Sequence, residues 1–187
     1  ISVRILDGVG LNGSRGLAVT REKWNSTKAA NNAEFKWSAD EYGKLGSNKY
    51  LCVWMDMSTN SIDFRKACWG IVTEYEESRP FRTDNYDSRS PFYYLADGSD
   101  TWEVLYHGSD GCFGEGDGES VKGLKGWFAF PIEYMTRSGD SLDENSVVTG
   151  FYFYFCLSES GMAGKDTYID NITLVEDYKT FLTDSGN

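Results

Sequence analysis

Apolar residues along this chain recur with a period of two in about ten short segments, and this alternation limits the folds open to it. The segments are rich in β-branched and aromatic residues and are bounded by Gly, Ser, Asn or Asp, which is typical of strands joined by turns. We predict strands over 2–6, 16–20, 33–38, 50–57, 68–75, 91–96, 102–107, 124–132, 149–157 and 168–175. So many strands without a long helix indicate an all-β fold, an antiparallel sandwich or barrel.

Helix is expected in only two places. Ser38 begins a helical turn that runs through Leu45, and a second short helix covers Asp177 to Leu182. No internal repeat, low-complexity tract or shift in composition divides the 187 residues, and this length suits one hydrophobic core. We therefore predict a single domain over 1–187.

The charge of the chain restricts its partners. The formal net charge is −11, and no basic stripe interrupts the acidic surface, so nucleic acid and anionic membrane are poor partners. The longest apolar run, 151–157, is far shorter than the ~20 residues of a membrane helix. Four cysteines, at 52, 68, 112 and 156, form no metal-binding pattern, and both free thiols and a disulfide stay open.

The alternation also assigns faces to the strands. On the core side we place Leu51, Val53, Met55 and Met57; Phe128, Phe130 and Ile132; and Phe151, Phe153, Phe155 and Leu157. On the opposite sides we place Tyr50, Cys52, Trp54 and Asp56; Trp127 and Ala129; and Tyr152, Tyr154 and Cys156. For the strand over 68–75, either face suits the core.

The abundance of aromatic residues suggests a sugar-binding surface. A pyranose ring has a flat apolar face and a rim of hydroxyls, so its site needs exposed aromatic planes beside hydrogen-bonding side chains. The candidate planes are Trp54, Trp69, Trp102, Tyr152 and Tyr154, and the candidate polar partners are Asp56, Arg65, Glu74 and Asn85. For each tryptophan the alternative is ordinary packing in the core, but 6 Trp and 12 Tyr are more than one sandwich core easily hides.

A carboxylate inside an apolar strand indicates a polar or metal-binding role. Asp170 interrupts the strand over 168–175, and a carboxylate there has to be paired, hydrogen-bonded or bound to metal. The glycine-rich hairpin over 6–14 offers Asp7 and Asn12, whose oxygens suit calcium. We expect a calcium site formed by these three residues, and the alternative is that Asp7 and Asp170 serve turns and bulges.

Four segments in this order resemble a jelly-roll carbohydrate-binding module of bacterial enzymes that degrade plant polysaccharides. They are GSRGLAVT at 13–20, YLCVWMDMS at 50–58, LKGWFAFPI at 124–132 and YIDNITLVED at 168–177. The resemblance implies a jelly-roll sandwich of two sheets, a structural calcium whose ligands fall on Asp170 and Asp7, and a concave sheet that binds polysaccharide.

The resemblance also implies a role for the chain. It implies an extracellular, monomeric module that binds a plant cell-wall β-glucan or hemicellulose, such as xyloglucan or mannan. Such a module brings an appended glycoside hydrolase, a cellulosome scaffold or a cell surface to its substrate, because attachment raises the local concentration.

Signs of catalysis are weak. Glu74 and Glu76 share one face of a strand but lie at a solvated strand end, and His107 alternates with Tyr106, so neither pair converges on a substrate. The sequence has no GxSxG elbow and no phosphate-binding fingerprint. We expect no enzyme activity. A jelly-roll glycoside hydrolase or lyase, and a structural or adhesion module, stay open as alternatives.

Overall fold

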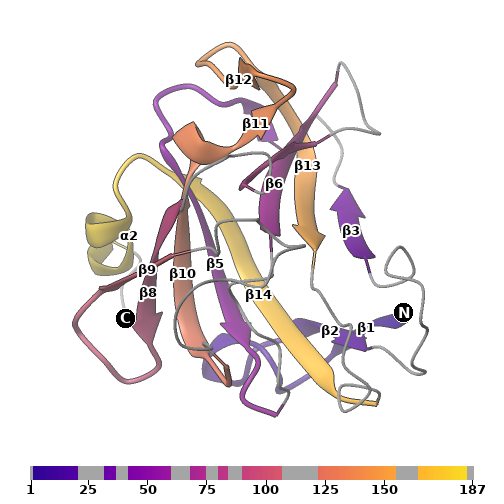
Figure 1. The fold of residues 1–187 in the computed structure, drawn as a ribbon. Helices are drawn as coiled ribbons and strands as arrows, with labels where there is room; N and C mark the ends of the chain where they lie inside the picture. The colour runs from indigo at the N-terminus through magenta and orange to yellow at the C-terminus, as the bar shows by residue number, and fades with distance from the viewer. Residues whose placement is uncertain are drawn as a thin grey trace.

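The computed structural model describes residues 2–20, 32–36, 42–59, 68–74, 80–83, 90–106, 122–154 and 164–184. These residues form an antiparallel β-sandwich of two sheets, as predicted (Figure 1). The chain passes between the sheets several times, so segments distant in sequence, such as β2 and β14, pair side by side. Among the described residues, the structure contains no helix with the length and hydropathy of a bilayer span.

Sheet A contains both the first and the last strand of the chain. Its strands, in spatial order, are β1 (Ser2–Leu6), β2 (Gly16–Thr20), β14 (Asp166–Val175), β5 (Tyr50–Asp56), β10 (Lys125–Pro131), β8 (Pro91–Ala96) and β9 (Glu103–Tyr106). Each agrees with a predicted segment to within a few residues.

Sheet B packs against one face of sheet A. Its strands are β12 (Asp140–Ser141), β11 (Thr136–Arg137), β7 (Phe81–Arg82), β6 (Cys68–Thr73), β13 (Val147–Tyr154) and β3 (Asn32–Lys36), and β4 (Gly43–Lys44) pairs with β13 beside this path. The four two-residue strands β4, β7, β11 and β12 were not predicted, because two residues are too short to show alternation. Two single-turn 3-10 helices, η1 (Leu11–Gly13) and η6 (Ile132–Tyr134), lie in connections.

The helix predictions had mixed outcomes. The C-terminal helix is confirmed as α2 (Tyr178–Asp184), and the Asp177 carboxylate caps it by accepting a hydrogen bond from the Lys179 backbone N–H at 2.9 Å. The helical turn expected over 38–45 is wrong at its end, because Gly43 and Lys44 pair with β13 as a strand. Its residues 38–41 lie outside the described residues.

The core between the sheets confirms the predicted inward faces. Leu51, Val53 and Met55 are fully buried there, together with Phe128, Phe130, Phe151 and Phe153. Trp69 completes this cluster: its ring stacks on Phe130 at 4.6 Å between ring centroids and meets Phe153 edge-on at 4.5 Å. The strand whose face was left open thus turns Trp69 and Ile71 into the core. Phe155 and Leu157 lie outside the described residues.

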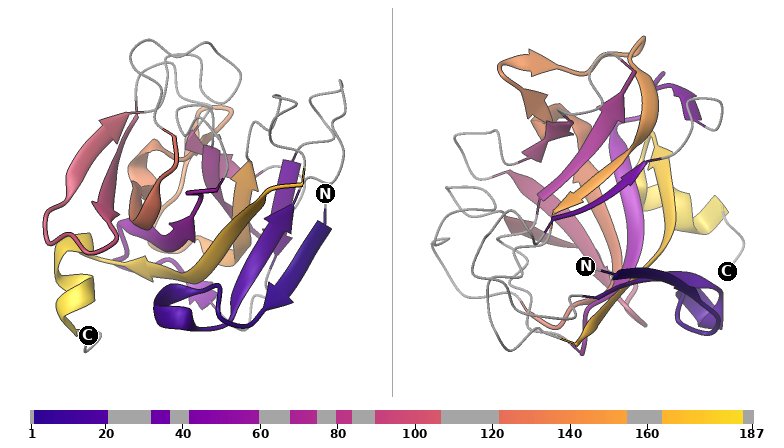
Figure 2. Two further views of the ribbon diagram at one scale, coloured as in Figure 1. Left: turned by 90° about the horizontal axis from the view of Figure 1, so that it is seen from below. Right: turned by 90° about the vertical axis from the view of Figure 1, so that its right-hand side faces the viewer.

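The face of sheet A that points away from sheet B, called here the outer face, is also covered. Tyr178 of α2 packs on Cys52 and Ala129, and a separate cluster contains Trp54, Leu95 and Trp127. Figure 2 (left) shows α2 and the turn between β1 and β2 on the same side of this sheet. Cys52 and Trp54, expected opposite the core, are therefore as buried as core residues.

Candidate functional site

An open groove crosses the outer face of sheet A, with a volume of about 860 Å³. Gly126 and Trp127 of β10 line its floor, the η1 turn with Leu11 and Asn12 lies on one side, and the segment 95–100 lies on the other. Leu182 of α2 also lines it. This volume is within the range of pockets that bind small molecules or sugar residues.

A smaller pocket of about 310 Å³ continues the groove, since Asn12 and Asp97 line both. The backbone of the glycine-rich turn after β1 forms one wall. The side chains that line it come from three strands and the 97–100 turn: Trp54, Asp56, Asp97, Lys125 and Tyr168. Polar groups from distant parts of the chain thus meet at one end of the groove.

The floor of the groove depends on pairing between three strands. Trp127 lies directly opposite Trp54 of β5 on one side and Leu95 of β8 on the other. Gly126 has φ of 146°, and a Cβ atom there would lie 2.1 Å from the Leu95 carbonyl oxygen. Only glycine permits this close approach of β10 to β8, so the groove floor requires it.

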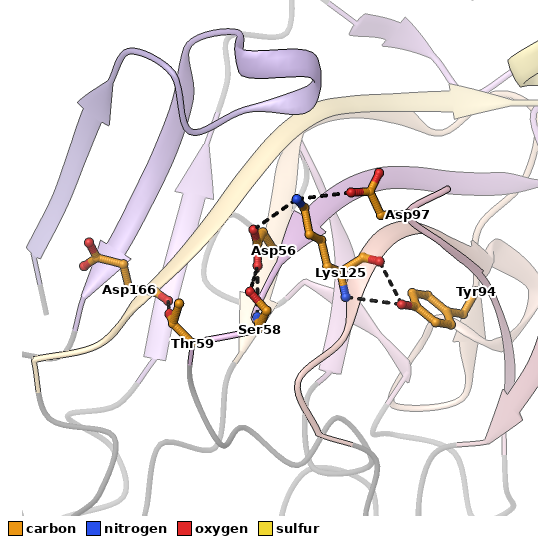
Figure 3. A network of polar contacts seen from close by, with 7 residues as sticks. All are labelled: Asp56, Ser58, Thr59, Tyr94, Asp97, Lys125 and Asp166. Atoms are coloured by element: carbon orange, nitrogen blue, oxygen red, sulfur yellow. Dashed lines mark hydrogen bonds and ion pairs between the residues drawn. The ribbon is translucent and has the colours of Figure 1, made fainter. Parts of the chain in front are cut away.

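A lysine joins two carboxylates at the polar end (Figure 3). The Lys125 Nζ lies 3.1 Å from Asp97 Oδ2 and 3.8 Å from Asp56 Oδ2. The hydrogen bond and the charge of Asp97 raise the pKa of Lys125, so the ammonium stays charged. The Lys125 side chain is 41% exposed and that of Asp97 is 51% exposed, so a ligand has access to both.

The backbone around Lys125 is held in place by neighbouring side chains. The Tyr94 hydroxyl donates to the Lys125 carbonyl oxygen at 2.7 Å and accepts from the Lys125 N–H at 3.2 Å. The Asp56 carboxylate accepts from the Ser58 N–H at 2.9 Å and from its hydroxyl at 2.6 Å. The Lys125 backbone and the Asp56 carboxylate are therefore held in place before any ligand binds, which lowers the entropic cost of binding.

The indole of Trp54 carries an unused donor beside this pocket. Its Nε1–H has no hydrogen-bond acceptor in the part of the chain that the structure describes, although Trp54 is only 3% exposed. The Lys125 ammonium lies 6.0 Å from its ring centroid. Buried donors are almost always paired, so this indole N–H is an exception among the described residues.

The predicted aromatic residues do not meet in one cleft. Trp54 lies under the groove, and Trp102 is partly exposed beside it on the same outer face. Tyr152 points the opposite way, from sheet B, where the Arg82 guanidinium carbon lies 5.6 Å from its ring centroid. Trp69 lies in the core with no exposed surface. The expectation of an exposed ring plane is therefore not met at Trp54, Trp69 and Tyr152, because all three residues are buried.

Of the two predicted polar partners that the structure describes, Asp56 lies at the groove. Glu74 is exposed just after β6, on the other sheet. Arg65 and Asn85, and the side chain of Tyr154, lie outside the described residues, as do Glu76 and His107.

The three predicted calcium ligands are engaged in separate contacts. Asp170 Oδ2 accepts from the Leu11 N–H at 3.0 Å and the Ser14 hydroxyl at 2.5 Å, and Oδ1 accepts from the Asn171 N–H at 2.8 Å. Asp7 forms an exposed ion pair with Arg15 at 2.9 Å. Asn12 has a left-handed backbone conformation in η1, with φ of 54°.

These contacts engage the predicted calcium ligands with other groups of the protein. The groups around Asp170 are N–H and O–H donors, which suit a carboxylate. Within the described ranges, no group of three or more His, Cys, Asp or Glu residues is arranged to hold a metal ion. The sequence predicts that the Asp170 carboxylate is paired, hydrogen-bonded or bound to metal, and in the structure it is hydrogen-bonded.

Sequence reasoning missed Asp97, Lys125 and Tyr168 as pocket residues. Asp97 precedes Gly98, which only signals a turn, and Lys125 lies in the predicted strand over 124–132 without any local motif. Their convergence results from pairing of β10 with β8 and β5, which a local pattern does not reveal. No protein-family model, curated protein or solved structure matches this chain.

Proposed function

We propose that this protein is a non-catalytic carbohydrate-binding module whose groove on sheet A binds a neutral polysaccharide. The observation that carries the proposal is the Lys125 ammonium held between Asp97 and Asp56 at the end of a groove with a tryptophan floor. Of two neighbouring sugar hydroxyls, one can donate a hydrogen bond to the Asp97 or Asp56 carboxylate, and the other can accept one from the Lys125 ammonium. The pair is therefore complementary to a diol.

The charge balance favours an uncharged ligand. Two carboxylates accompany one ammonium at the pocket, and the whole chain has a net charge of −11. A polyuronate chain would meet repulsion there, whereas a glucan, xyloglucan or mannan would not. The proposed ligand is accordingly a neutral plant cell-wall β-glucan or hemicellulose, and the proposed setting is an extracellular bacterial protein with an appended glycoside hydrolase or scaffold.

Two carboxylates in one groove also raise the alternative of glycoside hydrolysis. That reaction requires one carboxylic acid that holds its proton in the free enzyme, together with an ionised partner. Here both carboxylates lie beside the same ammonium, at 3.8 Å for Asp56 and 3.1 Å for Asp97, so the geometry does not give them the two separate roles that hydrolysis requires. We therefore favour carbohydrate binding over glycoside hydrolysis as the function of the groove.

Affinity electrophoresis in gels that contain xyloglucan, mixed-linkage glucan, mannan, xylan or pectin tests the proposal, with released reducing ends assayed in parallel. We expect retardation by a neutral polysaccharide without released ends. Released ends would make the protein a hydrolase, and no retardation in any gel would favour an adhesion or structural role.

A pair of lysine variants locates the site. Lys125→Met removes a charged hydrogen-bond donor, so we expect the affinity to fall about tenfold, equivalent to about 1.4 kcal/mol. Lys44→Met is the matched control, because Lys44 is an exposed lysine on β4, outside the groove. Equal effects of the two variants would contradict the proposed site.

A further inference from the structure

A row of aromatic and apolar side chains continues along the edge of sheet A from the groove. Trp102 precedes β9, and Val104 and Tyr106 follow at alternate positions, so the three share one face. Val104 pairs with Tyr93 and Tyr106 with Pro91, which places the row on the outer face beside β8. Val104 is 49% exposed and Tyr106 is 51% exposed, so the far end of the row is open to a ligand.

Trp102 connects this row to the groove. It packs against the cluster of Trp54, Leu95 and Trp127 beneath the groove and also against the cluster that contains Tyr178. Its ring meets the Tyr178 ring edge-on at 4.8 Å, and the Tyr178 ring stacks on Tyr93 at 4.3 Å. Packed aromatic and apolar side chains thus link the groove floor to the β8–β9 edge.

The chemistry of this edge suits a sugar chain. The phenol groups of Tyr50, Tyr93 and Tyr178 lie close together, and burial with this mutual proximity raises the pKa of Tyr178 to about 12. Neutral phenols supply both donors and acceptors next to apolar ring surface, and Glu133 and Asp177 are exposed nearby. A neutral polyhydroxylated chain meets each of these groups favourably, whereas an anionic chain would be repelled.

The length of the surface indicates how much of a chain it binds. Asp97 at the groove and Pro91 opposite Tyr106 are six residues apart along β8 and its end, which is about 20 Å at strand spacing. We propose that Trp102, Val104 and Tyr106 form a second set of subsites for the polysaccharide in the groove, so that the protein binds an extended chain of about four or more sugars and not a single residue or chain end. This inference rests on the proposed function.

Isothermal titration with oligosaccharides of graded length tests it. The probes are the two-, four- and six-residue oligosaccharides of the polysaccharide that retards the protein in gels: cello-oligosaccharides for a glucan, manno-oligosaccharides for mannan and xylo-oligosaccharides for xylan. We expect affinity to rise at least about tenfold from two to six residues, because added residues contact new rings. Equal affinity for two and six residues would overturn the inference.

Edge-strand variants provide the second readout. Tyr106→Ala is expected to lower affinity for the six-residue probe about tenfold and to leave that for the two-residue probe unchanged. Val3→Ala is the control, because Val3 is also 49% exposed but lies on β1, at the other edge of the sheet. Circular dichroism of Tyr106→Ala confirms that the variant is folded.

The outcomes separate this inference from the function on which it depends. If Tyr106→Ala binds the six-residue probe as tightly as the wild type while Lys125→Met binds it more weakly, the groove is supported as the binding site. The proposal of a second set of subsites is then wrong. If no polysaccharide retards the protein, both proposals fail.

Discussion

The Asp170 carboxylate of β14 accepts a hydrogen bond from the Leu11 backbone N–H at 3.0 Å, across 159 positions of sequence. The same oxygen accepts from the Ser14 hydroxyl, so one side chain holds both ends of the turn that walls the groove. Gly10 lies against this carboxylate, and a Cβ atom there would be 2.4 Å from Asp170 Oδ2. A residue that interrupts an apolar strand thereby positions a wall of the candidate site.

Replacing Asp170 should therefore affect both stability and binding. Asp170→Ala leaves the Leu11 N–H and the Ser14 hydroxyl without their acceptor, so the free energy of unfolding should fall by about 1–3 kcal/mol. Polysaccharide retardation should weaken as well, because the turn loses its anchor. Urea unfolding followed by tryptophan fluorescence, together with affinity gels, measures the two effects.

Asp7→Ala is the matched control for this variant. Asp7 forms an exposed ion pair with Arg15, and such pairs contribute less than about 1 kcal/mol. If Asp7→Ala were as destabilising as Asp170→Ala, the anchoring role assigned to Asp170 would be wrong.

Chelation distinguishes the hydrogen-bonded turn from the calcium site expected from the sequence. Because N–H and O–H donors already occupy both oxygens of Asp170, EDTA should leave the melting temperature unchanged. Differential scanning calorimetry with EDTA, and then with excess calcium, measures this. A fall in EDTA that calcium reverses would instead support the calcium site.

Gly126 should tolerate substitution far less than a glycine in the neighbouring turn. A Cβ atom at Gly126 would overlap the Leu95 carbonyl oxygen, whereas Gly98 has φ of 79° and no atom within 4 Å of its Cβ position. Gly98→Ala should cost about 1–2 kcal/mol of unfolding free energy from backbone strain alone. Gly126→Ala should cost more than this or prevent folding, as soluble yield and urea unfolding would report. Equal costs would mean that β10 shifts freely away from β8.

Stability should fall at alkaline pH for an identifiable reason. Burial raises the pKa of the Cys52 thiol to about 12 from an ordinary value of 9.0, and the pKa of Tyr178 rises to about 12 from 10.0. Above these ordinary values the unfolded chain loses protons that the folded chain keeps, so the free energy of unfolding decreases as pH rises. The loss begins near pH 9 with Cys52, steepens above pH 10 with Tyr178 and amounts to about 1.4 kcal/mol per group per pH unit.

Urea unfolding at pH 7, 9, 10 and 11 measures this dependence. Tyr178→Phe removes one of the two groups, so its stability should fall less steeply above pH 10 than that of the wild type. Identical slopes for the variant and the wild type would show that Tyr178 does not contribute.

The alternation in the sequence was sufficient to predict the core. Leu51, Val53 and Met55 lie inward because a strand turns successive side chains to opposite faces, and this relation is local. The same rule correctly grouped Trp54 with Cys52 on the other face of β5. It did not reveal that this face is covered, because the covering residues come from α2 and from the η1 turn, at opposite ends of the chain.

The candidate site likewise combines features that the sequence predicts with features that depend on distant segments. The sequence by itself determined the longer strands, the inward faces of three of them and the need for a polar partner at Asp170. Only the tertiary structure decided which strands are neighbours, and therefore that Lys125 meets Asp56 and Asp97 and that Trp102 borders the groove. The physical reason is range: strand alternation depends on adjacent residues, whereas exposure and ion pairing depend on segments that are distant in sequence and meet only in the folded chain.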